Sequence, residues 1–224
     1  SDRDPSQALR AQNECRALIQ NYPNSKYAPE TAQLLRNIQE ALGEHEFGIG
    51  TFYFERGANP AAVSRLSYLT DQYPLYSKTD EALYSTGRAY LSMGPRFRQK
   101  AGEAFARIVR EYPLSARADD AKEELKSLEF PIPEADRAAY DRDKYNQENY
   151  HRRSLISTST DFLHRGPDTS HASKMGDPSM AQVPVPLPLS VPVANNLPSE
   201  EANAGGGAPG SDVSGTVVQD STKL

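Results

Sequence analysis

Residues 44–74 read EHEFGIGTFYFERGANPAAVSRLSYLTDQYP, and this stretch contains the pattern that decides the fold. Ala62, Leu66 and Leu69 recur at i, i+4 and i+7, which places one small and two larger apolar residues on one face of a helix. The helix is expected to end at the Tyr-Pro pair 73–74, because proline cannot continue a helix and restricts the residue before it. The stretch therefore predicts a helix with one buried face and a sharp end.

The same pattern occurs twice more in the chain, each time before a Tyr-Pro pair. The equivalent positions are Ala11, Cys15 and Leu18 before Tyr22-Pro23, and Ala101, Phe105 and Ile108 before Tyr112-Pro113. Self-similarity of this kind is typical of repeat proteins, in which each helical unit packs against the next. The only cysteine, Cys15, falls on the predicted buried face and is interpreted as a core thiol.

A partner helix precedes two of these helices. Gly50 and Tyr53 come before the middle helix, and Gly87 and Tyr90 come before the last one. Small residues let two helices approach closely, the tyrosines fill the gap beside them, and residues 57–60 (GANP) form the expected turn with proline at the start of the next helix. This arrangement of glycine, tyrosine, alanine and proline predicts an all-α, right-handed solenoid of the tetratricopeptide type.

We expect six helices in the first part of the chain. Their predicted ranges are 5–21, 28–56, 60–72, 78–93, 97–111 and 115–128. The second range is longer than a repeat requires, but its apolar residues keep a helical rhythm throughout. A single helix, bent at Gly43, is one interpretation, and two helices broken at Gly43 is the other.

Composition changes after residue 133. Residues 183–193 read VPVPLPLSVPV and residues 204–210 read AGGGAPG, and neither run offers enough apolar side chains to form a core. We therefore predict a helical repeat domain over residues 1–133 and a disordered, Pro/Gly-rich tail over residues 134–224. Residues 134–150 form at most a marginal helix. The proline-rich run is also a candidate polyproline ligand for an aromatic groove.

The residue content argues against several functions. A net charge of -5, with mixed signs along the helices, predicts no binding to nucleic acid. The four histidines, His45, His151, His164 and His171, form no metal-ligand pattern, and no phosphate-binding loop or nucleophile motif is present. We predict a non-enzymatic protein without cofactor or metal. The sequence has no apolar run long enough to span a bilayer.

The repeat stretches resemble BamD, the tetratricopeptide lipoprotein family of the outer-membrane β-barrel assembly machinery. The most similar stretch is residues 44–74, which includes FYFERG at 52–57, AAVSR at 61–65 and the Tyr-Pro turn. Residues 80–94 and 104–125 also resemble the family. The resemblance covers roughly residues 5–133, and this part of the chain is similar to the C-terminal half of such a protein. It implies a scaffold on the periplasmic face of the outer membrane that docks to the POTRA domain of the barrel insertase, beside other assembly lipoproteins. Its membrane attachment would be a lipid anchor upstream of Ser1, and the family's substrate-binding repeats would also lie upstream.

Arginine and tyrosine are over-represented among the residues that dominate binding energy in protein interfaces. Our candidates for partner contacts are Arg56, Arg65, Tyr68 and Arg88, with Tyr76 and Tyr84 as weaker ones. The alternatives are intrachain roles: an ion pair for Arg65 and a core position for Tyr84. Two other functions stay open from the sequence. One is a periplasmic tetratricopeptide factor that coordinates envelope constriction in cell division, and the other is an adaptor domain attached to an upstream enzyme.

Overall fold

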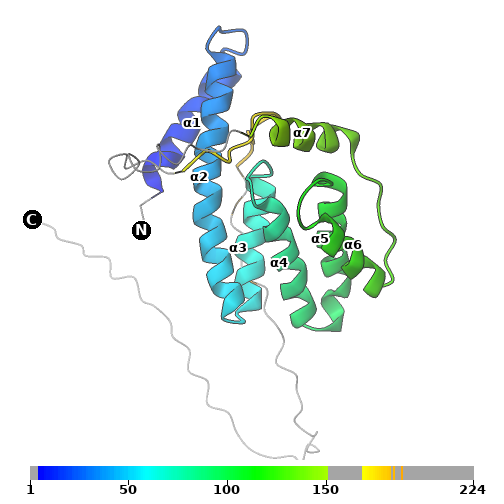
Figure 1. Cartoon of the computed structure of the whole chain (residues 1–224). Helices are drawn as coiled ribbons and strands as arrows, with labels where there is room; N and C mark the ends of the chain where they lie inside the picture. Colours follow the sequence, from blue (N-terminus) through cyan, green and yellow to red (C-terminus); the bar gives the residue numbers. More distant parts are fainter. Residues whose placement is uncertain (1–4, 151–167, 183, 185–187, 189–224) are drawn as a thin grey trace, which may run out of the picture. The chain divides into compact units, whose positions relative to one another are not determined.

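The computed structural model describes residues 5–150, 168–182, 184 and 188, all within one compact unit that spans residues 1–191 (Figure 1). The helices of the described part are α1 (Ser6–Asn21), α2 (Ala28–Glu55), α3 (Asn59–Gln72), α4 (Thr79–Ser92), α5 (Arg98–Glu111), α6 (Ala118–Ser127) and α7 (Arg137–Glu148), with a short 3-10 turn, η1 (Pro95–Phe97), before α5. The first six agree with the predicted ranges to within a few residues.

Helices α1 to α6 pack in chain order, each against the next (Figure 1). Neighbouring helices run in opposite directions, and the described residues contain no strand. The predicted all-α, tetratricopeptide-like fold is confirmed. Helix α2 is continuous through Gly43, so the single-helix interpretation is the correct one. Its N-terminal half packs on α1 and its C-terminal half on α3, which explains its 28 residues.

The three Tyr-Pro turns share one geometry. At Tyr22, Tyr73 and Tyr112 the backbone turns to φ between -136° and -129°, and each tyrosine N–H donates to the carbonyl four residues earlier. The N–H three residues after each tyrosine then donates back to the tyrosine carbonyl, at 3.0 to 3.1 Å. These bonds satisfy backbone groups at the helix end, so each turn starts the next helix in the same direction.

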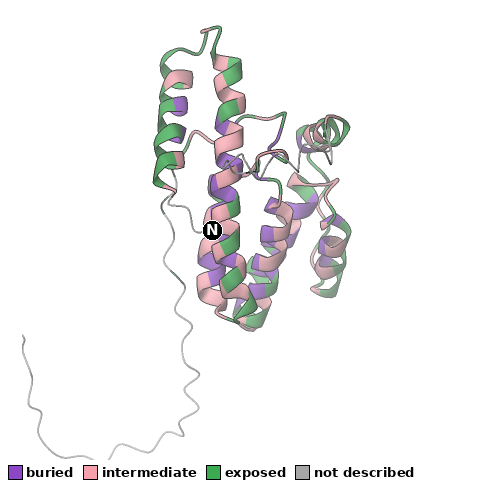
Figure 2. Cartoon of the chain, turned by 60° about the vertical axis from the view of Figure 1, so that its left-hand side comes forward, coloured by how far each residue is buried: buried purple, intermediate pink, exposed green. Residues whose placement is uncertain are grey.

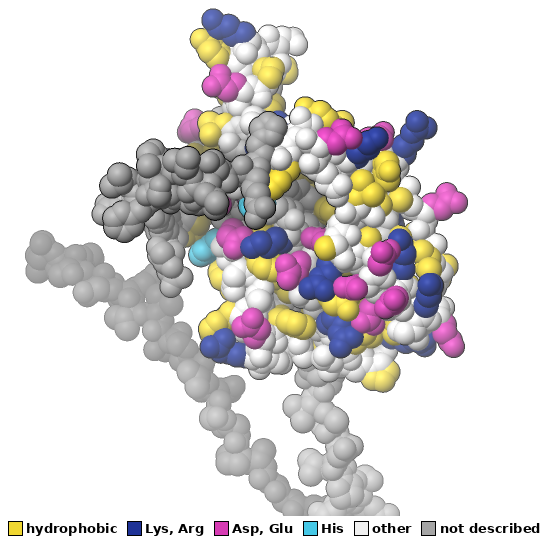
Figure 3. All heavy atoms as spheres, viewed as in Figure 1, with side chains coloured by type: hydrophobic (Ala, Val, Ile, Leu, Met, Phe, Trp, Pro, Cys, Tyr) yellow, Lys and Arg dark blue, Asp and Glu magenta, His cyan; other side chains and the backbone are white. Residues whose placement is uncertain are grey.

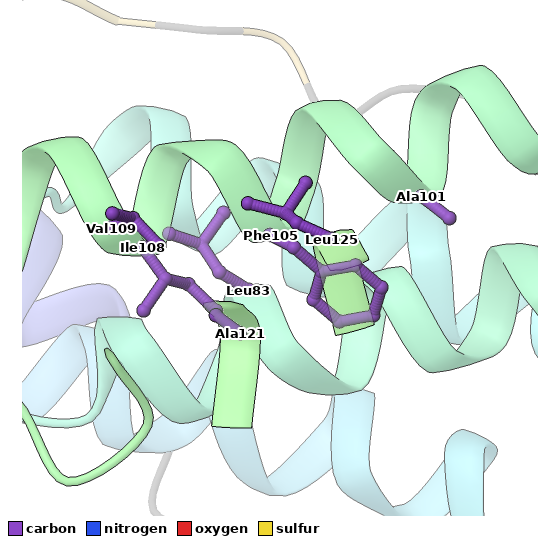
Figure 4. Packing of buried hydrophobic residues seen from close by; sticks show 7 residues of the cluster. All are labelled: Leu83, Ala101, Phe105, Ile108, Val109, Ala121 and Leu125. Atoms are coloured by element: carbon purple, nitrogen blue, oxygen red, sulfur yellow. The ribbon is translucent and has the colours of Figure 1, made fainter. Parts of the chain in front are cut away.

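Two apolar clusters form the core. One lies between α4, α5 and α6, where Figure 4 shows Phe105, Leu125 and Leu83 directed toward one another. The other lies between α2, α3 and α4 and consists of Leu42, Leu66, Leu69, Tyr73, Tyr76 and Ala82. Buried residues follow the sides of the helices that face their neighbours (Figure 2). The repeat positions Ala62, Leu66, Leu69, Ala101, Phe105 and Ile108 are all fully buried, as the spacing predicts.

The first copy of the repeat differs from the prediction. Cys15 is buried as expected, but Ala11 is exposed, and the other buried residues of α1 are the polar Gln12 and Arg16. The reason is that this side of α1 faces residues 179–181, whose backbone carbonyls accept hydrogen bonds from Arg16. A polar neighbour from a distant part of the chain thus accounts for the burial of polar side chains on this helix, as at Gln12, where the middle copy has Val63.

The region after residue 133 contains more structure than predicted. Helix α7 begins at Arg137, just after Asp136, whose side chain caps it, and Arg142 of α7 donates to the carbonyl of Glu111 at the end of α5. Residues 168–182, drawn in yellow in Figure 1, form turns and bends as far as Gly176 and an extended stretch after it, and they contact α1, α2 and α7. The glycine-rich run 204–210 and most of the proline-rich run 183–193 lie outside the described residues. Residue 133 as a domain boundary stays a prediction.

Candidate partner-binding surfaces

The turn from α2 to α3 presents an aromatic and a cationic side chain together. The guanidinium of Arg56 lies 3.5 Å from the centre of the Phe52 ring, and the Phe52 ring meets Tyr53 edge-on at 5.6 Å. Phe52 is 48% exposed, which is high for a phenylalanine. Gly57 follows with φ of 70°, a conformation that favours glycine, and turns the chain into α3. We call Phe52, Tyr53 and Arg56 the α2–α3 turn surface.

Arg65 and Tyr68 lie on one face of α3, since residues three apart in a helix are neighbours. Arg65 forms an ion pair with Glu46 of α2 at 3.3 Å, so the intrachain role considered for it is present. Tyr68 packs edge-on against Tyr73 at 6.2 Å and is half-buried at the border of the α2–α3–α4 cluster. Both side chains therefore stabilise the hairpin and also reach the surface.

Arg88 lies on a different face, between α4 and α6. It forms an ion pair with Glu124 at 2.7 Å, and the Tyr84 hydroxyl donates to the same carboxylate oxygen at 3.2 Å. The hydrogen bond to Glu124 raises the pKa of Arg88. Arg88 and Tyr84 thus share Glu124 as a partner, and they lie apart from the α2–α3 turn surface. Partner contact by Arg56, Arg65, Tyr68 or Arg88 stays a prediction.

Tyr76, the other weaker candidate, is not available to a partner. It is a buried member of the α2–α3–α4 cluster, and its hydroxyl donates to Glu44 at 2.6 Å. Burial raises the pKa of Tyr76, and the hydrogen bond to Glu44 raises it further. Its position two residues after a turn proline resembles a surface site in the sequence, but the tyrosine ring closes the space beside Gly43 of α2.

A buried carboxylate fixes the loop between α3 and α4. Glu40 of α2 is buried and accepts hydrogen bonds from both the backbone N–H and the hydroxyl of Ser77. Burial raises the pKa of Glu40, although the two bonds from Ser77 oppose that shift. One turn later, Glu44 accepts from Lys78 as well as from Tyr76. These contacts connect α2 to the loop and have no visible catalytic geometry.

Sequence reasoning missed a set of polar side chains that contact residues 168–182. Arg16 of α1, Gln39 of α2 and Gln72 of α3 are 4%, 3% and 2% exposed, and all three hydrogen-bond to backbone atoms of Ser179 or Ala181. We call these three residues the polar cradle. The available signal was weak: each polar residue lies next to an apolar stripe, where surface residues are also common. Only the position of a segment over 100 residues away shows their role.

The described residues contain no candidate metal-binding cluster. No group of three or more His, Cys, Asp or Glu side chains that could hold a metal ion exists within residues 5–150 and 168–182. His171 stacks on Tyr150 with ring centres 5.2 Å apart, while His151 and His164 lie outside the described residues. No helix in the described part is both long enough and apolar enough to cross a membrane.

Antiparallel helix pairs, close approach at glycine and alanine, and repeated Tyr-Pro turns define a tetratricopeptide-like repeat protein whose exposed arginine and aromatic residues suit protein binding. Over residues 1–102 the chain matches the YfiO family of outer membrane lipoproteins.

Curated relatives give the same result. Proteins named "Outer membrane protein assembly factor BamD" match from Neisseria meningitidis serogroup A (33% identity over 94 residues, 42% of this chain and 35% of that protein), Xylella fastidiosa strain 9a5c (29% over 94 residues, 42% and 32%) and Pasteurella multocida (38% over 76 residues, 34% and 29%). The BamD-like resemblance predicted from the sequence is confirmed for this part of the chain. The chain spans about a third of the length of these relatives.

Proposed function

We propose that the chain is a non-catalytic scaffold in outer-membrane protein assembly that docks to a POTRA domain of the barrel insertase. The observation that carries this proposal is the exposed α2–α3 turn surface, which lies inside the part of the chain that matches BamD proteins. The names of the relatives describe assembly factors, and the matching family consists of outer membrane lipoproteins. The chain would accordingly work at the periplasmic face of the outer membrane, through a lipid anchor and beside other assembly lipoproteins.

The chemistry of the α2–α3 turn surface fits a protein partner. Arginine and aromatic residues dominate the energetic centres of interfaces, because they bury a large area and still offer directed hydrogen bonds. Within the described residues Arg56 has no carboxylate partner, in contrast to Arg65 and Arg88. Its guanidinium is therefore available to an acidic group on a partner. Figure 3 shows basic and acidic side chains interspersed over the visible face of α4, α5 and α6, which gives no single-sign patch there.

The test is a binding measurement between the purified chain and the purified POTRA region of the insertase from the same organism. An Arg56→Glu variant should bind at least about 30-fold more weakly, the effect of losing a contact worth about 2 kcal/mol. The matched control is Arg96→Glu, since Arg96 is also an exposed arginine and lies 4.5 Å from the centre of the Phe97 ring. Phe97 is buried, so that pair presents no aromatic surface to a partner.

Arg96→Glu should bind as the unchanged chain does, and both variants should keep the same helical circular dichroism. Equal binding by the chain and its Arg56→Glu variant would exclude the α2–α3 turn surface as the docking site. Failure of the unchanged chain to bind the POTRA region, together with binding to division-associated envelope proteins, would favour the cell-division function instead.

A further inference from the structure

The extended segment at residues 177–182 is held through its backbone. The amide of Gln39 donates to the Ser179 carbonyl at 2.7 Å, and the Ser179 N–H donates back to the Gln39 side-chain oxygen at 3.0 Å. One glutamine side chain thus pairs with both polar backbone groups of one residue, as a neighbouring β-strand would. Such pairing recognises an extended backbone and does not depend on the Ser179 side chain.

The rest of the polar cradle repeats this mode of contact. Arg16 donates to the carbonyl of Ser179 at 3.0 Å and to that of Ala181 at 2.8 Å, and Gln72 donates to the Ala181 carbonyl at 2.6 Å. Alternate residues of the segment therefore present their carbonyls to the same side, which is the period of an extended chain. Three helices, α1, α2 and α3, each supply one side chain to these two carbonyls.

Two further contacts reach backbone carbonyls before the extended segment, in the turns and bends of residues 170–176. Arg36 of α2 donates to the Gly176 carbonyl at 2.8 Å, and Gln33 donates to the Ser173 carbonyl at 3.2 Å. Pro178 is the one buried residue of 177–182, and Ala172 and Ser173 are buried before it. The Pro178 ring packs without making a hydrogen bond, so the directed bonds in the segment are those to its backbone.

Two buried polar atoms of α1, the helix that supplies Arg16 to the cradle, have no hydrogen-bond partner in the described part of the chain. Gln12 of α1 is 3% exposed, and its side-chain oxygen has no hydrogen-bond partner in the described part of the chain. The same holds for one guanidinium nitrogen of the buried Arg16. Buried polar atoms without partners are costly, and they are uncommon where a segment is a permanent part of a fold.

The polar cradle is also suited to being empty. An apolar surface would be destabilised by losing its cover, but uncovered glutamine and arginine side chains bind water. Release of residues 177–182 would leave both core clusters of the repeats in place, because these clusters lie between the helices themselves. Because the segment and the cradle belong to the same chain, the segment has a high effective concentration at the cradle and can bind again after release.

We propose that the polar cradle is a binding site for an extended peptide backbone, and that residues 177–182 occupy it as an intrachain ligand. While this ligand is bound, the site is closed to any other extended chain. This proposal does not depend on the POTRA-docking function, because the cradle and the α2–α3 turn surface share no residue.

The test uses the full chain and a fluorescent peptide with the sequence of residues 168–182. In the unchanged chain the attached segment competes, so the peptide should bind weakly. A Ser179→Pro variant of the chain lacks the N–H that pairs with Gln39 and should release its own segment. It should bind the peptide at least about tenfold more tightly, because the free fraction of the site rises. The matched control is Ser179→Ala, which keeps the backbone N–H and should behave as the unchanged chain does.

A Gln39→Ala substitution added to the Ser179→Pro chain should abolish the gain in peptide binding, with the helical melt retained. Hydrogen exchange gives a second measurement: the Ser179 N–H should be protected in the unchanged chain and unprotected in the Gln39→Ala chain. Absence of peptide binding in the Ser179→Pro chain, or binding unaffected by Gln39→Ala, would overturn the proposal. A concentration-dependent dimer that Ser179→Pro converts to a monomer would assign the ligand to a second copy and overturn its intrachain part.

Discussion

Two glycines of α2, two residues apart, lie in opposite environments. A Cβ atom at Gly50 would lie 2.6 Å from Cγ of Leu66, a fully buried side chain of α3. A Cβ atom at Gly48 would meet nothing within 4 Å. The two positions therefore separate the helix propensity of alanine from the cost of overpacking within one helix.

We expect Gly50→Ala to lower the free energy of unfolding by about 1 to 3 kcal/mol, because Leu66 must move in a packed core. Gly48→Ala should raise it by about 0.5 to 1 kcal/mol through the better helix propensity of alanine. Urea denaturation followed by circular dichroism measures both changes. A stabilising Gly50→Ala would show that α2 and α3 are not in close contact.

Glu40 gives the stability a pH dependence of known sign. Its pKa in the folded chain is raised above the ordinary value of 4.5, mainly by burial. In the pH window between the pKa of Glu40 in the unfolded chain and its higher pKa in the folded chain, the folded chain binds the proton more strongly. The free energy of unfolding therefore falls as the pH rises through this window. Above the window the loss is complete and constant.

A Glu40→Gln variant should lack this fall, because glutamine does not titrate. The measurement is the free energy of unfolding of both proteins from about pH 4.5 to pH 7, compared as a difference so that the other carboxylates cancel. Plotted against pH, the difference in free energy of unfolding should slope between the pKa of Glu40 in the unfolded chain and that in the folded chain, and should be flat above both. A flat curve throughout would mean that Glu40 is solvated in the folded chain.

At the scale of the elements, α6 is attached to the repeats by two kinds of contact. Leu125 is buried in the α4–α5–α6 cluster, and its neighbour Glu124 forms the ion pair with Arg88. The side chain of Arg88 is 51% exposed, so water screens the pair. The apolar contact should therefore contribute more to the docking of α6 than the ion pair does.

We expect Leu125→Ala to cost about 2 to 5 kcal/mol of stability, because it leaves a cavity. Arg88→Ala should cost about 0 to 1 kcal/mol, the usual range for exposed pairs. Thermal melts of both variants at low and high salt check this, and only the effect of Arg88→Ala should diminish with salt. If Arg88→Ala and Leu125→Ala lowered the stability equally, the contacts of Glu124 with Arg88 and Tyr84 would be as important for holding α6 as the apolar contact.

At the scale of the whole molecule, helices α1 to α6 contain both core clusters, while α7 and residues 168–182 are attached to them by hydrogen bonds. We expect a chain shortened to residues 1–133 to melt cooperatively, at a lower temperature. Each kcal/mol of lost contact should lower the midpoint by about 4 °C for a chain of this size. Loss of the cooperative transition would mean that the region after residue 133 is required for folding.

The sequence by itself determined the repeat. Local spacing is sufficient for this, because the i, i+4 and i+7 stripes, the Tyr-Pro ends and the small residues at Gly50 and Gly87 depend on neighbours within one hairpin. The helix ranges, the continuous rhythm of α2 and the BamD-like resemblance follow from the same short-range patterns. The α2–α3 turn was also predictable from residues 57–60, because proline and glycine restrict the backbone locally.

Only the tertiary structure decided which polar residues are buried and what covers them. Arg16, Gln39 and Gln72 belong to three different helices, and their common partner, residues 179–181, is more than 100 residues away in the chain. Composition predicted disorder there, because the segment has too few apolar side chains to form a core of its own. It is ordered by hydrogen bonds from side chains of the repeats to its backbone, and backbone groups are the same in every sequence, so no pattern of residues in the segment reveals them.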